Sequence, residues 1–138
     1  ASAWIAANPG VPLALTGDFN IAPTDADNGD PTIIEGVSTH VSVPERDAFR
    51  SFATAGLVDV VRPIVPDGYT YWDYKQGRFQ KNEGLRIDFV LGSAALADLV
   101  TDASIHRDER IGDAPSDHVP VVVDLALEDD NDDRPMIF

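Results

Sequence analysis

The chain has 138 residues, of which 43% are hydrophobic, so it is long and apolar enough to form one domain with a buried core. It has no cysteine, which excludes disulfides and thiolate metal sites and agrees with a reducing cytoplasm. No apolar run reaches the roughly 18 to 20 residues of a membrane span, and the formal net charge of −14 argues against a nucleic-acid partner unless basic residues are concentrated locally.

The chain begins with a predicted strand and a polar loop. Residues 1–8 lack the basic region and the long apolar stretch of a signal peptide. Residues 11–16 are a short, continuous apolar run between a Pro-Gly pair and a glycine, which predicts a buried strand. Residues 22–36 are rich in Pro, Asp, Asn and Gly and predict a loop.

A helix is predicted after this loop. Ser42 and Glu45 have the spacing of a capping box, with a proline between them that suits the first turn. Gly56 is a residue type that commonly ends a helix. The face that we predict to be buried consists of Ala48, Phe49, Phe52 and Ala53.

The rest of the chain alternates between strands and helices. Residues 69–74 are aromatic and favour a strand, and residues 85–91 predict the next one. A capping serine precedes a short predicted helix over residues 94–100, followed by a brief strand near residues 103–106. The strongest strand pattern covers residues 119–127. Strands and helices mixed in this way predict a layered α/β fold.

The charged residues are unevenly distributed along the chain. Residues 1–127 are predicted to fold, and residues 128–138 to form a disordered acidic tail. Within the folded part, four of the ten Lys and Arg residues form a basic stripe: Lys75, Arg78, Lys81 and Arg86. Such a stripe can hold phosphate, but it is equally typical of a solvated loop.

Polar residues follow the first predicted strand. Asp18 and Asn20 are two residues apart at its end, so in extended geometry both side chains point to the same side. Sites in α/β proteins gather at the carboxyl ends of strands. The carboxylate can bind a hard cation or take a proton from water, and the amide can hold a phosphate oxygen or the attacking water. The structural alternative is an Asx-type turn at the end of the strand.

A second carboxylate lies inside an apolar strand pattern, residues 87–91. Burial of Asp88 there is costly unless it is paired. Arg86, on the same face, could pair with it structurally. Alternatively, Asp88 accepts a hydrogen bond from a histidine and fixes its tautomer. Asp117 and His118, just before the last strand, supply such a histidine, although a turn with a satisfied histidine would have the same pattern.

Three polar motifs thus occur at three predicted strand ends of one small domain: Gly-Asp-Phe-Asn at 17–20, Arg-Ile-Asp at 86–88 and Ser-Asp-His at 116–118. Turns alone explain this coincidence poorly, so we interpret the three motifs as one site. The other two histidines, His40 and His106, have no comparable neighbours and are interpreted as ordinary loop residues.

The chain resembles exonuclease III-type apurinic/apyrimidinic endonucleases, which belong to the endonuclease/exonuclease/phosphatase family. GDFN and SDH recur across this larger family, which includes deoxyribonuclease I-like nucleases and lipid or inositol phosphatases. GLRID and the aromatic WDY segment are typical of the DNA-repair branch. The segments that carry the resemblance are LALTGDFNIAPTDAD, PERDAFRSFATAGLVDVVR, YTYWDY, GLRIDFVLGS and PSDHVPVVVDL.

The resemblance implies that this chain is part of a larger fold. Family members have two similar halves, each a sheet with helices, packed as a four-layer α/β/β/α sandwich. The sheet is expected to be mixed and mostly antiparallel, with helices on one face. The first half supplies an asparagine, a metal-binding glutamate and an active-site tyrosine that have no counterpart in this sequence. We therefore expect the C-terminal half of such an enzyme, with the N-terminal half as its partner.

The resemblance also implies a role for each motif residue. Asp18 would orient or deprotonate the attacking water, and Asn20 would contact the phosphate and help to fix that water. His118 would donate to the scissile phosphate and be held by Asp88, and Asp117 would lie close to the metal. The implied catalytic residues are Asp18, Asn20, Asp88 and His118, and the implied metal ligands are Asp18, Asn20 and Asp117.

Aromatic residues near the basic stripe have two interpretations. Tyr71 and Trp72 belong to an alternating aromatic set of the kind that most often packs in a core, but such rings can also stack on a sugar or base. The resemblance places Tyr71, Trp72 and Arg86 at the pocket for a flipped abasic sugar. That residue is easily extruded because it has no base to unstack.

The implied function is that of a Mg²⁺-dependent DNA phosphodiesterase in base-excision repair, with Mn²⁺ as an alternative metal. It would be cytoplasmic, cleave 5′ to abasic sites and degrade strands from 3′ to 5′, so its substrate partner would be double-stranded DNA with abasic sites or 3′ ends. No membrane partner is expected. Two alternatives stay open: a family phosphatase acting on a lipid or inositol phosphate, and an inactive half-domain that needs a partner.

Overall fold

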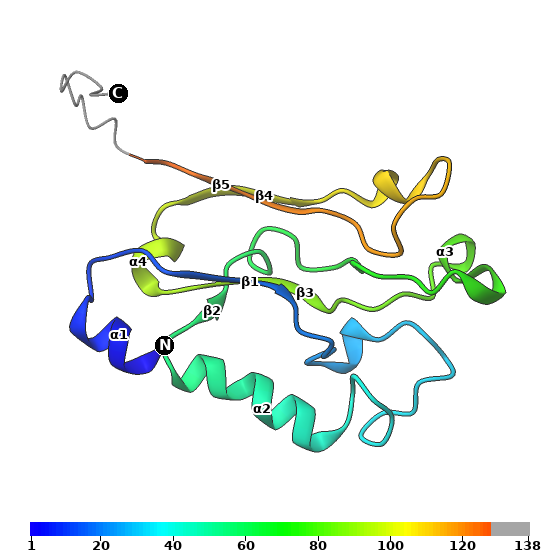
Figure 1. Cartoon of the computed structure of the whole chain (residues 1–138), viewed down its shortest axis with the longest axis horizontal. Coiled ribbons are helices and arrows are strands. Elements are labelled where there is room, and N and C mark those ends of the chain that lie inside the picture. Colours follow the sequence, from blue (N-terminus) through cyan, green and yellow to red (C-terminus); the bar gives the residue numbers. More distant parts are fainter. Residues whose placement is uncertain (128–138) are drawn as a thin grey trace, which may run out of the picture.

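Two antiparallel sheets form the centre of this computed structural model, which describes residues 1–127 (Figure 1). The first sheet has the strand order β1-β3-β2, and the second pairs β4 with β5. The strands are β1 (Ala14–Asp18), β2 (Val58–Asp59), β3 (Asp88–Gly92), β4 (Val100–Ile105) and β5 (Val121–Leu125). The predicted α/β class with mostly antiparallel pairing is confirmed.

The helices are short except for α2. In Figure 1, α2, Val43–Thr54, lies with α1, Ser2–Ala7, on one side of β1 and β3, while β4 and β5 lie on the other side. The other α-helices are α3 (Arg78–Lys81) and α4 (Ala94–Ala97). The 3₁₀ turns are η1 (Asp25–Asp27), η2 (Lys75–Gly77) and η3 (Arg107–Arg110). No helix among residues 1–127 is long and apolar enough to cross a membrane. The predicted acidic tail, residues 128–138, lies outside the described residues.

An aromatic cluster attaches α2 to the first sheet. The rings of Phe49 and Phe52 on α2 lie 5.6 and 5.4 Å from the ring of Phe19, which directly follows β1. Phe49 also lies 4.9 Å from Phe89 of β3. The two contacts with Phe19 are edge-to-face, an arrangement that is favourable beyond the apolar area that it buries. The cluster holds Phe19 in the core and so fixes the two polar residues on either side of it.

The boundaries of α2 agree with the predicted signals. Ser42 is the N-cap. The backbone N–H of Ser42 donates to the Glu45 carboxylate at 3.1 Å, which completes the capping box. Gly56 follows the C-cap with a φ of +89°, which glycine adopts without steric cost. The predicted buried face is wrong in part, because the two phenylalanine rings fill the space above the sheet and leave Ala48 and Ala53 exposed.

The first strand is displaced and more exposed than predicted. It begins at Ala14 rather than at residue 11, and all five of its residues are exposed, so the prediction of a buried strand is wrong. The physical reason is its position, because β1 lies at the edge of the first sheet and pairs with β3. Among the later strands, β3 begins at Asp88 rather than at residue 85, and β4 begins at Val100, where the helix was predicted to end.

Residues 69–74 do not form the predicted strand. This segment makes only isolated bridges, from Tyr71 to Leu85 on one side and to His118 on the other. The backbone N–H groups of Thr70 and Tyr71 both donate to the Leu85 carbonyl, at 2.8 and 3.0 Å, whereas consecutive N–H groups of a regular strand point to opposite edges. The segment nevertheless connects the first sheet to the polar motif before β5.

A close approach of the chain at Gly84 gives a prediction about stability. A Cβ atom added there would lie 2.5 Å from Trp72 Nε1 and 2.7 Å from the carbonyl oxygen of Tyr71. Because the indole is buried and the carbonyl belongs to the backbone, we expect Gly84→Ala to lower the free energy of unfolding by about 1–3 kcal/mol in urea denaturation. Gly10→Ala is the matched control, since within residues 1–127 no atom beyond the chain neighbours lies within 4 Å of a Cβ atom at that position. Equal effects of the two substitutions would contradict the explanation.

Candidate active site

Two carboxylates face each other across the first sheet. Asp18 is the last residue of β1 and Asp88 is the first residue of β3, and the register of the two strands pairs them directly. Like charges that lie directly opposite on neighbouring strands destabilise a sheet. The pairing therefore calls for a hydrogen-bond donor or a cation between the two side chains.

His118 provides such a donor. Its Nδ1 atom lies 2.9 Å from Asp88 Oδ2, and its Nε2 atom lies 3.8 Å from Asp18 Oδ2. Because an ionised carboxylate can only accept, the Nδ1–H group donates to Asp88, and Nε2 faces Asp18. The imidazole reaches this place through the backbone bridge between Tyr71 and His118. The structure thus joins two of the three predicted motifs by a direct hydrogen bond.

Asn20 completes the group through a tight turn. Its φ is +53°, a left-handed conformation that asparagine tolerates better than most residues. Asp18 Oδ1 accepts the backbone N–H of Asn20 at 2.7 Å, and Asp18 Oδ2 accepts its side-chain amide at 3.0 Å. The two side chains meet as predicted, but by means of an Asx-type turn rather than by strand alternation. The structural interpretation of this motif as a turn is therefore confirmed, and the functional interpretation stays a prediction.

A cluster of metal-ligating atoms lies at the centre of the group. One ligand atom each from Asp18, Asp88 and His118 lies within 4.8 Å of the others. The carboxylate of Asp18 and the amide oxygen of Asn20 are hard ligands that fit Mg²⁺ or Mn²⁺, whereas Asp88 and His118 already satisfy each other. Asp117, the other predicted ligand, does not belong to this cluster among the described residues. Its carbonyl oxygen instead accepts the backbone N–H of the residue at position 72 at 2.9 Å.

Tyr71 is the predicted substrate contact that the structure brings to the group. Its ring centroid lies 5.0 Å from that of His118. Burial raises the pKa of the Tyr71 hydroxyl, and the negative charges of Asp73 and Asp117 add to the rise. The phenol therefore keeps its proton at neutral pH and can donate a hydrogen bond. It lines a hollow of about 610 Å³ beside the group.

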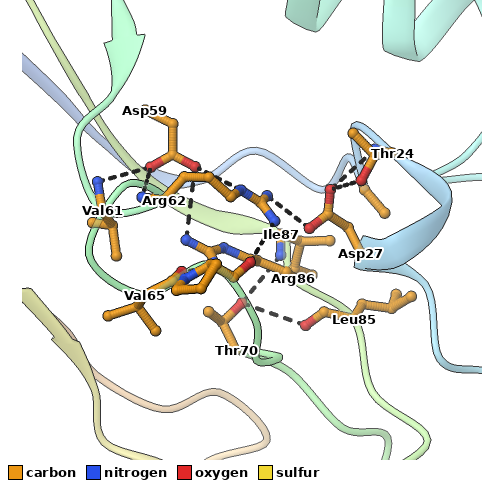
Figure 2. Close-up of polar contacts among 12 residues, drawn as sticks. Thr24, Asp27, Asp59, Val61, Arg62, Val65, Thr70, Leu85, Arg86 and Ile87 are labelled. Atoms are coloured by element: carbon orange, nitrogen blue, oxygen red, sulfur yellow. Dashed lines mark hydrogen bonds and ion pairs between the residues drawn. The ribbon is translucent and has the colours of Figure 1, made fainter.

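Arg86 lies in a buried ion-pair network and not at this group (Figure 2). It is 1% exposed, donates to the Val65 carbonyl at 2.8 Å, and lies 3.7 Å from Asp59. Arg62 belongs to the same network, at 3.5 Å from Asp59 and 2.7 Å from buried Asp27. Burial lowers the pKa of Arg86 and the charge of Arg62 adds to this effect, whereas Asp59 and Asp27 oppose it. The structure therefore does not bring this predicted substrate contact to the site.

Two further residues that we singled out from the sequence lie in the core. Trp72 is 1% exposed, and its ring packs edge-on against a phenylalanine ring at 5.2 Å. Arg78 is also buried and pairs with Glu83 and Asp30. The interpretation of a phosphate-holding basic stripe is therefore wrong for Arg78 and Arg86, because buried guanidinium groups need carboxylate partners of their own.

His40 is a residue of the site that the sequence interpretation missed. Its Nδ1 atom lies 2.7 Å from the carbonyl oxygen of Asn20, so the ring donates to the backbone of the turn, and it lines the same hollow as Tyr71. No local pattern reveals this contact, because the partner is twenty residues away in the chain. His106, in contrast, contacts Ser104 Oγ at 2.8 Å, as expected for an ordinary surface residue.

Comparison with known proteins adds to this geometry. Residues 1–118 match the Endonuclease/Exonuclease/phosphatase family. An exodeoxyribonuclease of Bacillus subtilis is 37% identical over 113 residues, which cover 80% of this chain and 43% of that protein.

Solved structures agree with this match. The 3′ phosphatase NExo from Neisseria, bound to a product DNA hairpin, is 40% identical with a TM-score of 0.78, covering 84% of this chain and 46% of the other. An AP endonuclease from Archaeoglobus fulgidus is 30% identical with a TM-score of 0.73, covering 84% and 46%. The chain thus spans less than half the length of these relatives.

Proposed function

Because the chain belongs to the endonuclease/exonuclease/phosphatase family, we propose that it supplies part of the active site of an exonuclease III-type enzyme that hydrolyses DNA phosphodiesters in base-excision repair. The proposed substrates are duplexes with abasic sites or 3′ ends. The observation that carries the proposal is the arrangement of Asp18, His118 and Asp88, with one imidazole between two cross-strand carboxylates. A turn or a structural ion pair would not need a histidine that faces both Asp88 and Asp18.

In the proposed reaction, Asp18 acts on the attacking water. Its carboxylate is accessible at the end of an edge strand and can accept the proton that the water loses as its oxygen bonds to phosphorus. The bond from phosphorus to the leaving sugar oxygen breaks in the same displacement. Asn20, held 3.0 Å from Asp18 Oδ2 through its amide nitrogen, presents its amide oxygen or nitrogen to the water and the phosphate.

His118 stabilises the phosphate. With Nδ1–H bound to Asp88 at 2.9 Å, the ring is fixed so that Nε2 points toward the phosphate position beside Asp18. In its imidazolium form, Nε2–H donates to a phosphate oxygen on which negative charge develops, and the Asp88 carboxylate stabilises that cation. Tyr71, which keeps its proton, can donate a second hydrogen bond from the same side.

A divalent cation, Mg²⁺ or Mn²⁺, would neutralise charge on the phosphate and on the leaving oxygen. Asp18 and Asn20 offer hard oxygen ligands for it, and we also place Asp117 near it. The proposal includes further ligands on a second half of the fold that packs against this sheet. Apolar side chains that are exposed on β1 and β5, including Leu15 at 38% and Leu125 at 37%, are consistent with such a cover.

Metal removal tests the proposal. The complete protein is expected to nick a duplex with a single abasic site in the presence of Mg²⁺ and to lose this activity with a chelator, because the proposed reaction needs the cation to neutralise charge on the phosphate and on the leaving oxygen. The chain of residues 1–138 alone should show weak Mg²⁺ binding and no cleavage above background, and the matching first half added in trans should restore some activity. Robust cleavage by the chain alone would contradict a site that is shared between halves.

A second candidate substrate is a 3′-terminal phosphate. The relative that is named a 3′ phosphatase is 40% identical to this chain. We infer that the same Asp18–His118–Asp88 arrangement could act on a phosphomonoester. Parallel assays on an abasic duplex and on a duplex with a 3′-phosphate distinguish the two substrates. The lipid or inositol phosphatase that the sequence left open has no counterpart among the relatives described above.

A further inference from the structure

Thr70 touches the backbone next to both members of the Asp88–His118 pair. We propose that Thr70 is a positioning residue, which sets the geometry of this pair through its side-chain hydroxyl on one side and its carbonyl oxygen on the other. The inference deepens the proposed function, since its catalytic meaning rests on the role of the pair in that reaction. Thr70 itself is fully buried, at 0% exposed, and does not contact the substrate position.

The hydroxyl holds the start of β3. Thr70 Oγ1 accepts the backbone N–H groups of Ile87 and Asp88, both at 3.1 Å. It also lies 3.5 Å from the Leu85 carbonyl oxygen, to which it can donate; Figure 2 shows Thr70 with Leu85 and Ile87. A hydroxyl has one proton and two lone pairs, so these three contacts use its full capacity. Its orientation and the positions of the two amides are therefore fixed together.

Two consecutive amides that share one acceptor indicate an irregular backbone. In a regular strand the N–H groups of successive residues point to opposite edges, so one oxygen cannot accept both. Their convergence on Thr70 occurs where the ladder between β1 and β3 ends, at the pair of Asp18 and Asp88. Irregularities of this kind change the direction of a side chain at the end of a strand. Here the side chain concerned is that of Asp88.

The carbonyl oxygen of Thr70 holds the other member of the pair. It accepts the backbone N–H of Val119, the residue after His118, at 2.9 Å. Since Thr70 joins the two backbones, a displacement of this residue changes the 2.9 Å distance between His118 Nδ1 and Asp88 Oδ2. A side chain that only filled the core would need its methyl group and its volume, but not its hydroxyl.

Two substitutions separate these explanations. Thr70→Val keeps the size and branching of the side chain and removes the hydroxyl, whereas Thr70→Ser keeps the hydroxyl. Ser93→Ala is the matched control, because Ser93 is also buried, and its Oγ accepts two backbone N–H groups at the opposite end of β3, from Leu13 at 3.1 Å and Leu96 at 3.4 Å.

The experiment records NMR spectra of the ¹⁵N-labelled chain without DNA or metal, so a failed nuclease assay would leave its result intact. We expect a hydrogen-bonded Nδ1–H signal of His118, assigned by its loss in His118→Gln, in the unsubstituted chain, in Thr70→Ser and in Ser93→Ala. In Thr70→Val this signal should disappear, and the Ile87 and Asp88 amides should exchange about tenfold faster or more.

Three outcomes would overturn the proposal. These are a Thr70→Val chain that keeps the His118 signal, a Ser93→Ala chain that loses it equally, and an unsubstituted chain that lacks it. If Thr70→Val does not fold, Thr70→Ser decides, because a folded serine variant without the His118 signal also overturns the proposal.

Discussion

Asp18→Asn is expected to lower kcat/KM for cleavage of an abasic duplex by about 10²–10⁴-fold in the complete protein. The substitution keeps the shape of the side chain but removes its ability to take a proton from water. It also places an amide opposite Asp88 in the β1–β3 register, which relieves the repulsion there, so the fold should be retained. Binding of the duplex should change little, as measured by fluorescence anisotropy with Mg²⁺ replaced by Ca²⁺.

The control for this prediction is Asp47→Asn. Asp47 is an exposed carboxylate on α2, so its replacement removes the same charge from the chain without touching the site. We expect its activity to stay within about twofold of the unsubstituted protein, since surface charges far from the substrate are largely screened. A loss of less than about tenfold for Asp18→Asn would remove Asp18 from the role of general base.

Removal of either member of the Asp88–His118 pair is expected to cost nearly as much as removal of both. The two groups are joined by a 2.9 Å hydrogen bond. In the proposed reaction they act on the phosphate through one atom, His118 Nε2. A double-mutant cycle with Asp88→Ala and His118→Ala, measured as kcat/KM, should therefore give a coupling energy of about 1–3 kcal/mol. Additivity within about 0.5 kcal/mol would place the two residues in separate roles.

His106→Ala is the matched control for the histidine. His106 also makes one hydrogen bond through its ring, with Ser104 Oγ at 2.8 Å, but it lies at an exposed position after β4. Its replacement should leave kcat/KM unchanged, whereas His118→Ala should lower it by a factor similar to that of the double variant. Equal effects of the two histidine substitutions would indicate a general effect on the fold.

Local signals predicted the parts of the fold that local chemistry determines. Three signals lie where the sequence predicted them: the capping box of Ser42 and Glu45, the glycine after α2, and the serine before α4. Each depends only on contacts between residues that are at most four positions apart. For Asp88, the cost of burying a carboxylate predicted a partner but left Arg86 and His118 both open, and the family resemblance favoured His118, which lies thirty residues away.

Contacts that depend on several distant segments could not be predicted in this way. Residues 69–74 have the composition of a strand, but their amides are used by segments on both sides, and this depends on where residues 85 and 118 lie. The position of Arg86 also depends on a distant segment, since its guanidinium pairs with Asp59 of β2. Hydropathy carried no signal for either case.

The exposure of β1 shows a third limit. Its apolar residues were predicted to be buried, and the position of the strand at the edge of the sheet leaves them accessible. Hydropathy reports which side chains favour burial, but the neighbour that covers them is a property of the assembled fold.

Insertions and deletions are constrained by the register that places Asp18 opposite Asp88. Strand side chains alternate between faces, so one residue gained or lost within β1 or β3 would turn one carboxylate to the other face and leave His118 with a single partner. Length changes in the exposed loop of residues 111–114, between β4 and β5, leave that register intact. Homologous chains should therefore vary in length in this loop while keeping both strands free of gaps. An engineered insertion should likewise be tolerated in the loop and not within β1 or β3.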